Sequence, residues 1–255
     1  MNMRCHPGKS PKPKKKLFLI TAAVILTAAA SFFLLPRPSA PPASPGIPAS
    51  PLVLPAALKA GETIIFGKYE QDNDRNNGAE PIAWQVLAVE NGRALLISSK
   101  ALDAKPYSKK WARTTWETCD LRKWLNGDFY TGAFSPAEQE RILTVTNKNP
   151  DNPVSRIKGG NDTKDRIFLP DIDEAGEYFE SDEARQCRAT PYAKAQASYV
   201  NEYKDSSWWW LRSRGSSSRT AALVLFSGYV SQVGYGVNNT GGFVRPAFWL
   251  DLRHE

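Results

Sequence analysis

Histidine is the residue type that most restricts the chemistry open to this chain. Only His6 and His254 occur, near the two ends of the 255 residues. A Ser-His-Asp or Cys-His catalytic site needs a positioned imidazole, and many zinc and copper sites use the same group as a ligand. The sequence therefore favours a binding protein over an enzyme, and it offers no catalytic residue, metal site or cofactor.

Two cysteines, Cys119 and Cys187, lie in the larger C-terminal part of the chain. If their thiols meet outside the cytoplasm, a disulfide is expected, and it would close a long loop. The alternative is that both are buried and pack as small apolar residues. The sequence favours these two interpretations equally, and both over a reactive cysteine.

Oxygen-bearing side chains alternate at Asp72, Asp74 and Asn76, a pattern that suggests a calcium loop. An EF-hand loop needs Gly at its sixth position and Glu at its twelfth. Counted from Asp72, these positions hold Asn77 and Ala83. We therefore predict a solvated turn between two strands rather than a metal site.

Three consecutive tryptophans are the first candidates for binding. Alternate side chains of a strand point to opposite faces, so Trp209 is expected in the core and Trp208 and Trp210 on the other face. If exposed, these two rings would be stacking platforms for a sugar or a peptide, because an indole combines a large apolar face with a polar N–H. Trp208 and Trp210 are thus predicted ligand-binding residues.

The segment after the tryptophans is rich in Tyr, Ser and Asn between glycines. This composition is typical of adaptable binding loops, although an ordinary polar surface at glycine turns is the alternative. Arg245, which precedes Pro246, is instead expected to pair with buried carboxylate or carbonyl groups of the scaffold. We predict ligand binding by Tyr229, Tyr235, Asn238 and Asn239, with Ser216, Ser217, Ser218, Arg219, Ser231 and Gln232 as further candidates.

The formal net charge of +7 belongs to the N-terminus. Residues 1–56 contain seven basic and no acidic residues, so residues 57–255 are neutral overall. A protein whose function is to bind nucleic acid usually carries its basic residues on the folded domain. We therefore expect no nucleic-acid partner.

A hydrophobic segment explains the basic N-terminus. Leu17 to Leu35 is 19 residues without charge, Pro or Gly, and as a helix it would span about 28 Å, close to the bilayer core of about 30 Å. By the positive-inside rule, residues 1–16 form a cytoplasmic tail and residues 17–35 a transmembrane signal anchor. A cleaved signal peptide is the alternative, although cleavage after Ala30 would leave an apolar stub.

A linker rich in Pro, Ala and Ser follows, over residues 36–57. Its eight prolines predict an extended, semi-rigid spacer, because such a segment cannot bury a core. Residues 58–255 have the length of one ordinary domain. This topology places that domain outside the cytoplasm, in a single-pass protein of the cell membrane.

Local signals place strands at both ends of this domain and helices between them. The runs at 82–89 and 93–98 flank Asn91-Gly92, a strong hairpin signal because both turn positions need positive φ. Capping patterns predict three helices, which begin at Thr114, Ser135 and Asp171. Strands, helices and strands in this order indicate an α+β fold.

Six phrases of the sequence together resemble one bacterial family, the domain of unknown function 6273. They are Phe66–Tyr69, Glu80–Leu87, Thr115–Asn126, Ser181–Cys187, Trp209–Ser213 and Val244–Ala247. The resemblance covers residues 60–252. It implies a C-type-lectin-like fold, in the branch that includes formylglycine-generating enzymes and retroelement-diversified binding proteins.

The leading hypothesis is a membrane-anchored, extracytoplasmic ligand-binding or protein-interaction module, whose ligand is a glycan or a peptide. The second is an oxidative modifying enzyme similar to formylglycine-generating enzymes. Those enzymes use a pair of cysteines in the C-terminal half of the fold, whereas no cysteine follows Cys187 here. The third is a structural ectodomain that positions a cell-envelope assembly.

Overall fold

The computed structural model describes residues 57–200, 202–203 and 205–253. The predicted cytoplasmic tail, membrane anchor and nearly all of the linker lie outside these residues. Among the residues that are described, no helix is both long enough and apolar enough to cross a membrane.

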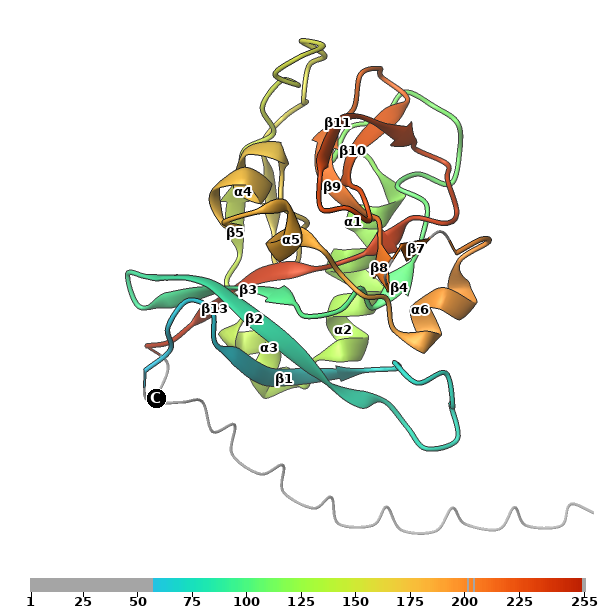
Figure 1. The fold of residues 1–255 in the computed structure, drawn as a ribbon. Coiled ribbons are helices and arrows are strands. Elements are labelled where there is room, and N and C mark those ends of the chain that lie inside the picture. Colours follow the sequence, from blue (N-terminus) through green and yellow to red (C-terminus); the bar gives the residue numbers. More distant parts are fainter. Residues whose placement is uncertain (1–56, 201, 204, 254–255) are drawn as a thin grey trace, which may run out of the picture. The chain divides into compact units, whose positions relative to one another are not determined.

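The first sheet joins the beginning of the domain to its end. Four antiparallel strands lie in the order β1 (Thr63–Tyr69), β2 (Glu80–Glu90), β3 (Arg93–Ser98) and β13 (Ala247–Asp251) (Figure 1). The predicted hairpin is confirmed, because Asn91 and Gly92 join β2 to β3 with φ values of 50° and 72°. The C-terminal strand thus completes a sheet that the N-terminal strands begin.

The second sheet carries the tryptophan run. Its order is β11 (Val230–Gly236), β10 (Thr220–Val224), β9 (Trp209–Arg214), β12 (Phe243–Val244) and β4 (Asp103–Ala104). Only the β12–β9 pairing is parallel. Two short ribbons complete the strands: β5 (Val145–Asn147) with β6 (Thr163–Asp165), and β7 (Glu202–Tyr203) with β8 (Ser206–Ser207).

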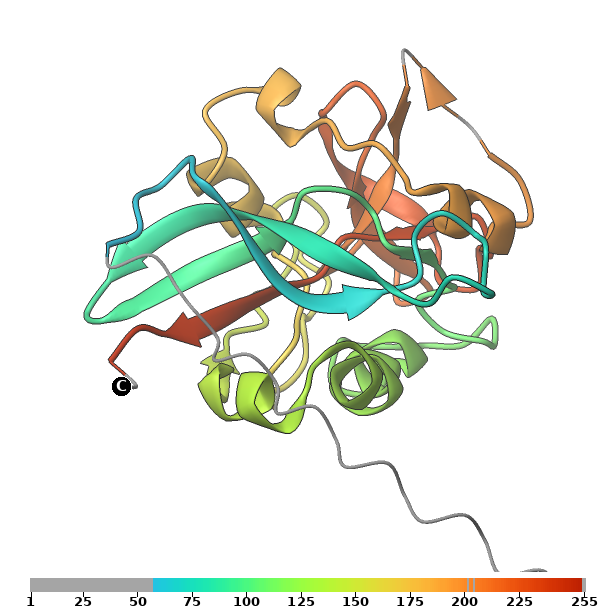
Figure 2. The same ribbon diagram turned by 90° about the horizontal axis from the view of Figure 1, so that it is seen from below.

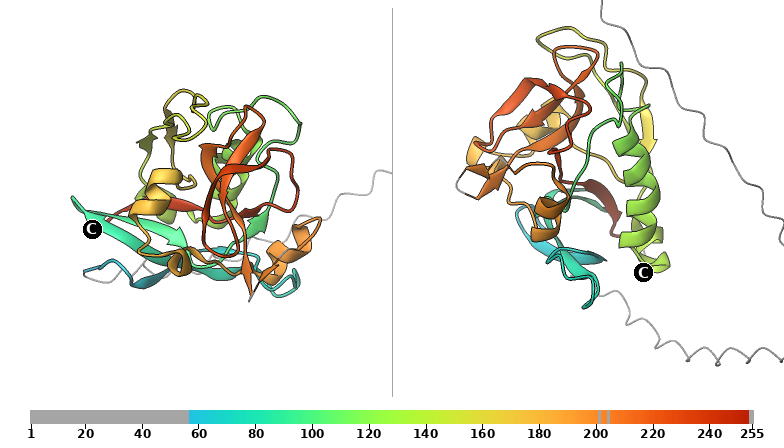
Figure 3. Two further views of the ribbon diagram at one scale, coloured as in Figure 1. Left: turned by 45° about the horizontal axis from the view of Figure 1, so that its top comes forward. Right: turned by 90° about the vertical axis from the view of Figure 1, so that its right-hand side faces the viewer.

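The helices are short, and most of them lie between the two groups of strands in the chain. They are α1 (Asp120–Trp124), the π-helical turn η1 (Leu125–Phe129), α2 (Tyr130–Ala133), α3 (Pro136–Arg141), α4 (Ile172–Glu177), α5 (Asp182–Arg185) and α6 (Pro191–Gln196). The right panel of Figure 3 shows α1, η1 and α2 as one continuous green helix. In Figure 2 the green helices and the orange helices lie on opposite sides of the first sheet. The fold is therefore α+β with mostly antiparallel strands, as predicted.

Two of the three predicted helix starts are confirmed. Ser135 with Glu138, and Asp171 with Glu174, each form a complete capping box. The predicted start at Thr114 is wrong, because α1 begins at Asp120 and its cap is Cys119, whose Sγ accepts from Arg122 N at 3.3 Å. A sulfur acceptor is absent from the usual cap pattern of Ser, Thr, Asp and Asn, so the pattern pointed to the wrong residue.

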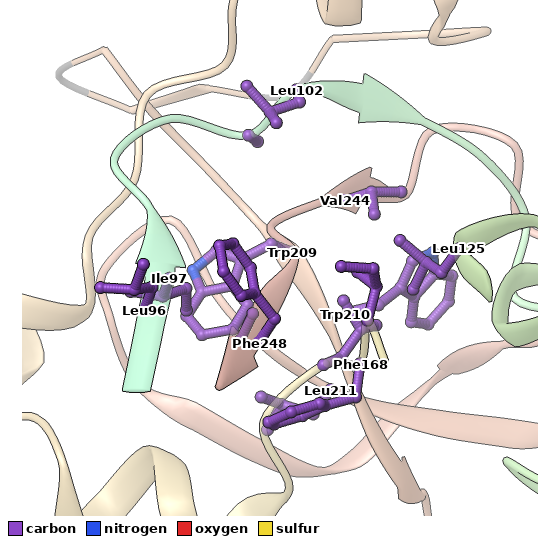
Figure 4. Close-up of a cluster of buried hydrophobic side chains, with 14 of the residues drawn as sticks. Leu96, Ile97, Leu102, Leu125, Phe168, Trp209, Trp210, Leu211, Val244 and Phe248 are labelled. Carbon is purple, nitrogen blue, oxygen red and sulfur yellow. The ribbon is translucent and has the colours of Figure 1, made fainter. Parts of the chain in front are cut away.

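The core lies where the two sheets meet. Figure 4 shows Trp209 and Trp210 of β9 beside Phe248 of β13, together with Leu125 of η1 and Phe168. All five side chains are buried. The tryptophan run is therefore central to packing, and it anchors the second sheet to the first.

Candidate functional site

All three consecutive tryptophans are buried. Their exposed fractions are 1%, 0% and 0% for Trp208, Trp209 and Trp210. The core position of Trp209 is confirmed, but Trp208 and Trp210 are buried as well, so the exposure on which their predicted role in ligand binding depended is not met. Trp208 packs edge-on against Trp210 and Tyr235, at centroid distances of 4.8 and 5.1 Å. The segment around Lys105 covers the same side, since its carbonyl accepts from Trp210 Nε1 at 3.0 Å.

The other predicted ligand-binding residues do not form one site. Tyr229 and Tyr235 lie at opposite ends of β11, about 20 Å apart along an extended strand. Tyr235 is held against Trp208, and Asn239 exchanges hydrogen bonds with the Tyr199 hydroxyl at 2.8 and 3.1 Å. Asn238 is exposed on the loop after β11. Tyr229 borders a recess of the described surface.

That recess is a small hollow on β11, which we call the β11 hollow. It has a volume of about 220 Å³. Its lining combines β11 and its turn with two other loops, and it consists of Asn152, Val154, Ser155, Ser216, Tyr229, Ser231, Gln232 and Val233. Four of these residues, Ser216, Tyr229, Ser231 and Gln232, belong to the set predicted from the sequence.

Two local features build the β11 hollow. The turn between β10 and β11 is closed by hydrogen bonds from Leu225 N to Tyr229 O and from Gly228 N to Leu225 O, and Gly228 has a φ of 89°. From the other side, the buried Asn152 amide donates to the carbonyls of Arg214 and Gln232, each at 2.9 Å. The turn therefore sets the position of Tyr229, and Asn152 fixes its loop against the sheet.

The β11 hollow contains an acceptor that the protein does not satisfy. Gln232 Oε1 is buried and has no hydrogen-bond partner among the described residues. The rim is apolar and open, because Val154, Tyr229 and Val233 are 74%, 58% and 63% exposed. The chain has no charged residue between Arg219 and Arg245. An incoming group would thus meet an uncharged surface that is apolar at its edge, with one unpaired acceptor on a lining residue.

The two cysteines of the domain are free and buried. Cys119 Sγ lies 3.3 Å from the Trp116 carbonyl, whereas Cys187 Sγ lies 3.5 Å from the carbonyl of Arg188. The disulfide interpretation is therefore not realised here, and the arrangement is that of buried thiols. Burial raises the pKa of Cys119 to about 12 and also raises the pKa of Cys187. Both changes favour the protonated thiol over the nucleophilic thiolate.

The predicted acidic turn is held by its own carboxylates. Asp72 Oδ1 accepts from Asp74 N at 2.8 Å, and Asp74 Oδ1 accepts from Asn76 N at 3.0 Å. Carboxylate oxygens of Glu70, Asp72 and Glu80 come within 4.8 Å of one another, close enough to share a cation. The carboxylates of Glu70 and Glu80 also accept backbone N–H groups of the loop, so each already has a structural role.

Arg245 has the predicted scaffold role. The side chain is buried, and it donates from Nε to the Ser98 carbonyl at 2.9 Å. Its guanidinium lies 5.2 Å from the ring centroids of both Phe179 and Trp209. Of the two expected kinds of partner, the structure provides backbone carbonyls, and the Gln85 amide oxygen accepts from it in addition.

Sequence reasoning missed the residues that reach the site from distant segments. Asn152 and Val154 line the β11 hollow, yet Asn152 precedes Gln232 by 80 positions. A buried Asn in a loop carries no local signal of the strand that it will contact. The only available hint was the segment Asn149–Pro153 itself, in which each of two asparagines is followed by a proline that restricts the backbone.

Comparison with known families assigns most of the domain. Neither a curated protein nor a solved structure matches the chain. The model of one family, described as a domain of unknown function (DUF6273), matches residues 91–252. That range includes the helices, the tryptophan run and the β11 hollow, and it begins after the first two phrases that carried the resemblance. Because the match covers more than half of the sequence, the chain belongs to the DUF6273 family.

Proposed function

We propose that this domain is a protein-interaction module and that it binds its partner at the β11 hollow. The observation that carries the proposal is Gln232 Oε1, a buried acceptor on a residue that lines the hollow, which has no donor among the described residues. Leaving a buried acceptor unpaired destabilises a folded protein by about 1–3 kcal/mol. Gln232 as a whole is half-buried, so a partner that turns its amide toward the hollow and supplies the donor removes this penalty in the complex.

The size of the hollow favours one side chain of a protein over a free small molecule. Pockets for small ligands usually enclose about 300–1,000 Å³, and this one encloses about 220 Å³. Around it, the exposed side chains of Val154, Tyr229 and Val233 extend the apolar surface. Protein interfaces commonly combine a central pocket for one anchor residue with such flat contacts around it.

The anchor residue that fits this chemistry is a tyrosine or a tryptophan of the partner. Either brings an apolar ring for the rim and one O–H or N–H for Gln232 Oε1. A lysine or an arginine fits less well, because no carboxylate lies among the residues that line the hollow, and burial of an unpaired charge is unfavourable.

The lectin-like scaffold and the membrane anchor belong to the same proposal. The scaffold is supported by the sequence resemblance, and the anchor by the uncharged segment Leu17–Leu35 between a basic tail and a Pro-rich linker. In this arrangement the linker holds the domain away from the bilayer, outside the cytoplasm. The β11 hollow is then available to proteins of the cell envelope.

A photo-crosslinking experiment tests the proposal with the full chain. The crosslinker p-benzoylphenylalanine replaces either Val233, at the rim, or Ile65 on β1, which is exposed to a similar extent (58%). We expect a crosslinked protein partner from Val233 and not from Ile65, and we expect Tyr229→Ser to remove it. Equal crosslinking from both positions, or a product that Tyr229→Ser leaves unchanged, contradicts the proposal.

A further inference from the structure

A second, larger recess lies where the first sheet meets α4 and the β5–β6 ribbon, and we call it the Arg93 cleft. It encloses about 490 Å³, within the usual range for small ligands. It shares no lining residue with the β11 hollow. The residues that matter for binding come from distant parts of the chain: Glu90, Arg93, Thr144, Thr146, Tyr178 and Trp249.

Arg93 presents a fixed donor that has no acceptor. Its guanidinium lies over the Trp249 ring at 4.1 Å from the centroid, and one terminal nitrogen binds Glu90 Oε1 at 2.6 Å. Its Nε is buried and has no hydrogen-bond partner among the described residues. The other terminal nitrogen also has no hydrogen-bond partner in the ranges that the structure describes. Because the ring and the carboxylate hold the guanidinium in place, an acceptor that enters the cleft meets a preorganised N–H at that nitrogen.

Hydroxyl groups line the same cleft as Arg93. Thr144, Thr146 and Tyr178 all line the cleft, and no hydrogen bond involves their hydroxyls within the described part of the chain. The two threonines are exposed, and Tyr178 is half-buried. Each hydroxyl can both donate and accept, so the walls can satisfy a ligand that also does both.

The charges of the cleft are balanced, which indicates an uncharged ligand. Arg93 is paired with Glu90, and the buried Arg212 at the base is paired with Asp171 and Glu174. Lys148, which also lines the cleft, pairs with Asp162, which does not. No cation is left to attract a phosphate or a carboxylate, and no carboxylate is left to attract an amine.

We propose that the Arg93 cleft binds a neutral saccharide. A sugar hydroxyl can accept from the unpaired terminal nitrogen of Arg93 and donate to the Glu90 carboxylate at the same time, which matches an unpaired donor and its neighbouring acceptor. Further ring hydroxyls bind Thr144, Thr146 and Tyr178, and the half-buried ring of Tyr178 provides aromatic surface. This function is separate from protein binding at the β11 hollow, and either can exist without the other.

The test is a titration of the full chain with neutral tetrasaccharides: chitotetraose, cellotetraose and maltotetraose. A charged tetragalacturonate and a tetra-alanine peptide serve as comparison ligands. We expect at least one neutral sugar to bind, as measured by calorimetry, with little binding of the two comparison ligands. Arg93→Lys keeps the charge over Trp249 but removes the planar pair of terminal guanidinium nitrogens, and should weaken binding about tenfold.

Two further variants separate binding from folding. Tyr178→Phe removes only a hydroxyl and should weaken sugar binding several-fold while the melting temperature stays the same. Tyr229→Ser, at the β11 hollow, should leave sugar binding unchanged. The proposal is overturned if no neutral sugar binds, if only the charged sugar or the peptide binds, or if Arg93→Lys and Tyr178→Phe bind sugar as the parent does.

Discussion

Arg212 in the middle of β9 binds Asp171 at 2.6 Å, and this carboxylate is also the N-cap of α4. The guanidinium is 2% exposed, and it reaches Glu174 of the same capping box. Two residues that a sequence identifies as a helix cap are therefore also the counter-ions of a buried cation. The ion pair joins α4 to the second sheet, next to the Arg93 cleft.

Loss of this cation should destabilise the fold strongly. Arg212→Met keeps an apolar side chain of similar length but leaves Asp171 and Glu174 without their partner. Removal of one partner from a buried ion pair usually lowers the free energy of unfolding by about 3–5 kcal/mol. Urea denaturation measures the free energy of unfolding. Arg219→Met, on the exposed β9–β10 turn, is the control and should change this free energy by less than about 0.5 kcal/mol. Similar values for the two variants would contradict a structural role for Arg212.

The two buried thiols should be inert in the folded protein. In a Cys5→Ser background, iodoacetamide should modify Cys119 and Cys187 only after guanidinium chloride unfolds the chain, because both are buried and protonated. Site-resolved mass spectrometry measures the modification. Rapid labelling of either thiol in the native state would instead favour a reactive cysteine.

The pKa of Cys119 also predicts a pH dependence of stability. Burial raises this pKa from its ordinary value of 9.0 to about 12. The folded state therefore retains a proton that the unfolded state loses, so this contribution is complete below pH 9.0 and is lost as the pH rises toward about 12. The slope for one such group is about 1.4 kcal/mol per pH unit. Between pH 9.0 and about 12, the free energy of unfolding should therefore fall less steeply with pH in Cys119→Ala, by this amount. Urea denaturation at several pH values measures the difference.

The predictions from sequence succeeded where a structure depends on neighbouring residues and failed where it depends on distant ones. The Asn91-Gly92 hairpin and the capping boxes at Ser135 and Asp171 are local, and all three are confirmed. Strand alternation separated Trp209 from its neighbours. It could not reveal that the segment around Lys105, a hundred positions earlier, covers the other face of the strand.

The candidate sites show the same division. Tyr229 and Gln232 were identified because their strand has the composition of a binding loop, and both line the β11 hollow. Asn152 and the whole Arg93 cleft were missed, because each depends on contacts between segments that are far apart in the sequence. No periodicity or turn signal carries that information.

Gly228 should tolerate no side chain. It has a φ of 89°, and an added Cβ would overlap the backbone carbonyl of Asp182 at the start of α5. Gly228→Ala should therefore lower the free energy of unfolding by about 1–3 kcal/mol. Gly176 in α4 is the matched control, because nothing lies within 4 Å of its added Cβ. There, alanine should raise the free energy of unfolding by about 0.5–1 kcal/mol. Thermal melts compare the two variants.

Gln232 and Gln85 form a matched pair for the acceptor that carries the proposed function. Gln232 Oε1 is buried without a donor, whereas Gln85 Oε1 accepts from the buried guanidinium of Arg245 at 3.4 Å. Gln232→Leu should leave the free energy of unfolding unchanged or raise it by about 1 kcal/mol, because an unpaired acceptor is removed. Gln85→Leu should lower it by about 1 kcal/mol, because a donor is left unpaired.

The same pair separates stability from binding. Gln232→Leu should lose the crosslinked partner seen from Val233, whereas Gln85→Leu should keep it while the domain stays folded. A stable protein with a weakened interaction is the expected result when a residue is retained for binding at the expense of folding. If Gln232→Leu destabilises the domain as much as Gln85→Leu does, Gln232 already has a donor in the folded chain. The β11 hollow would then lose the feature that marks it as a binding site.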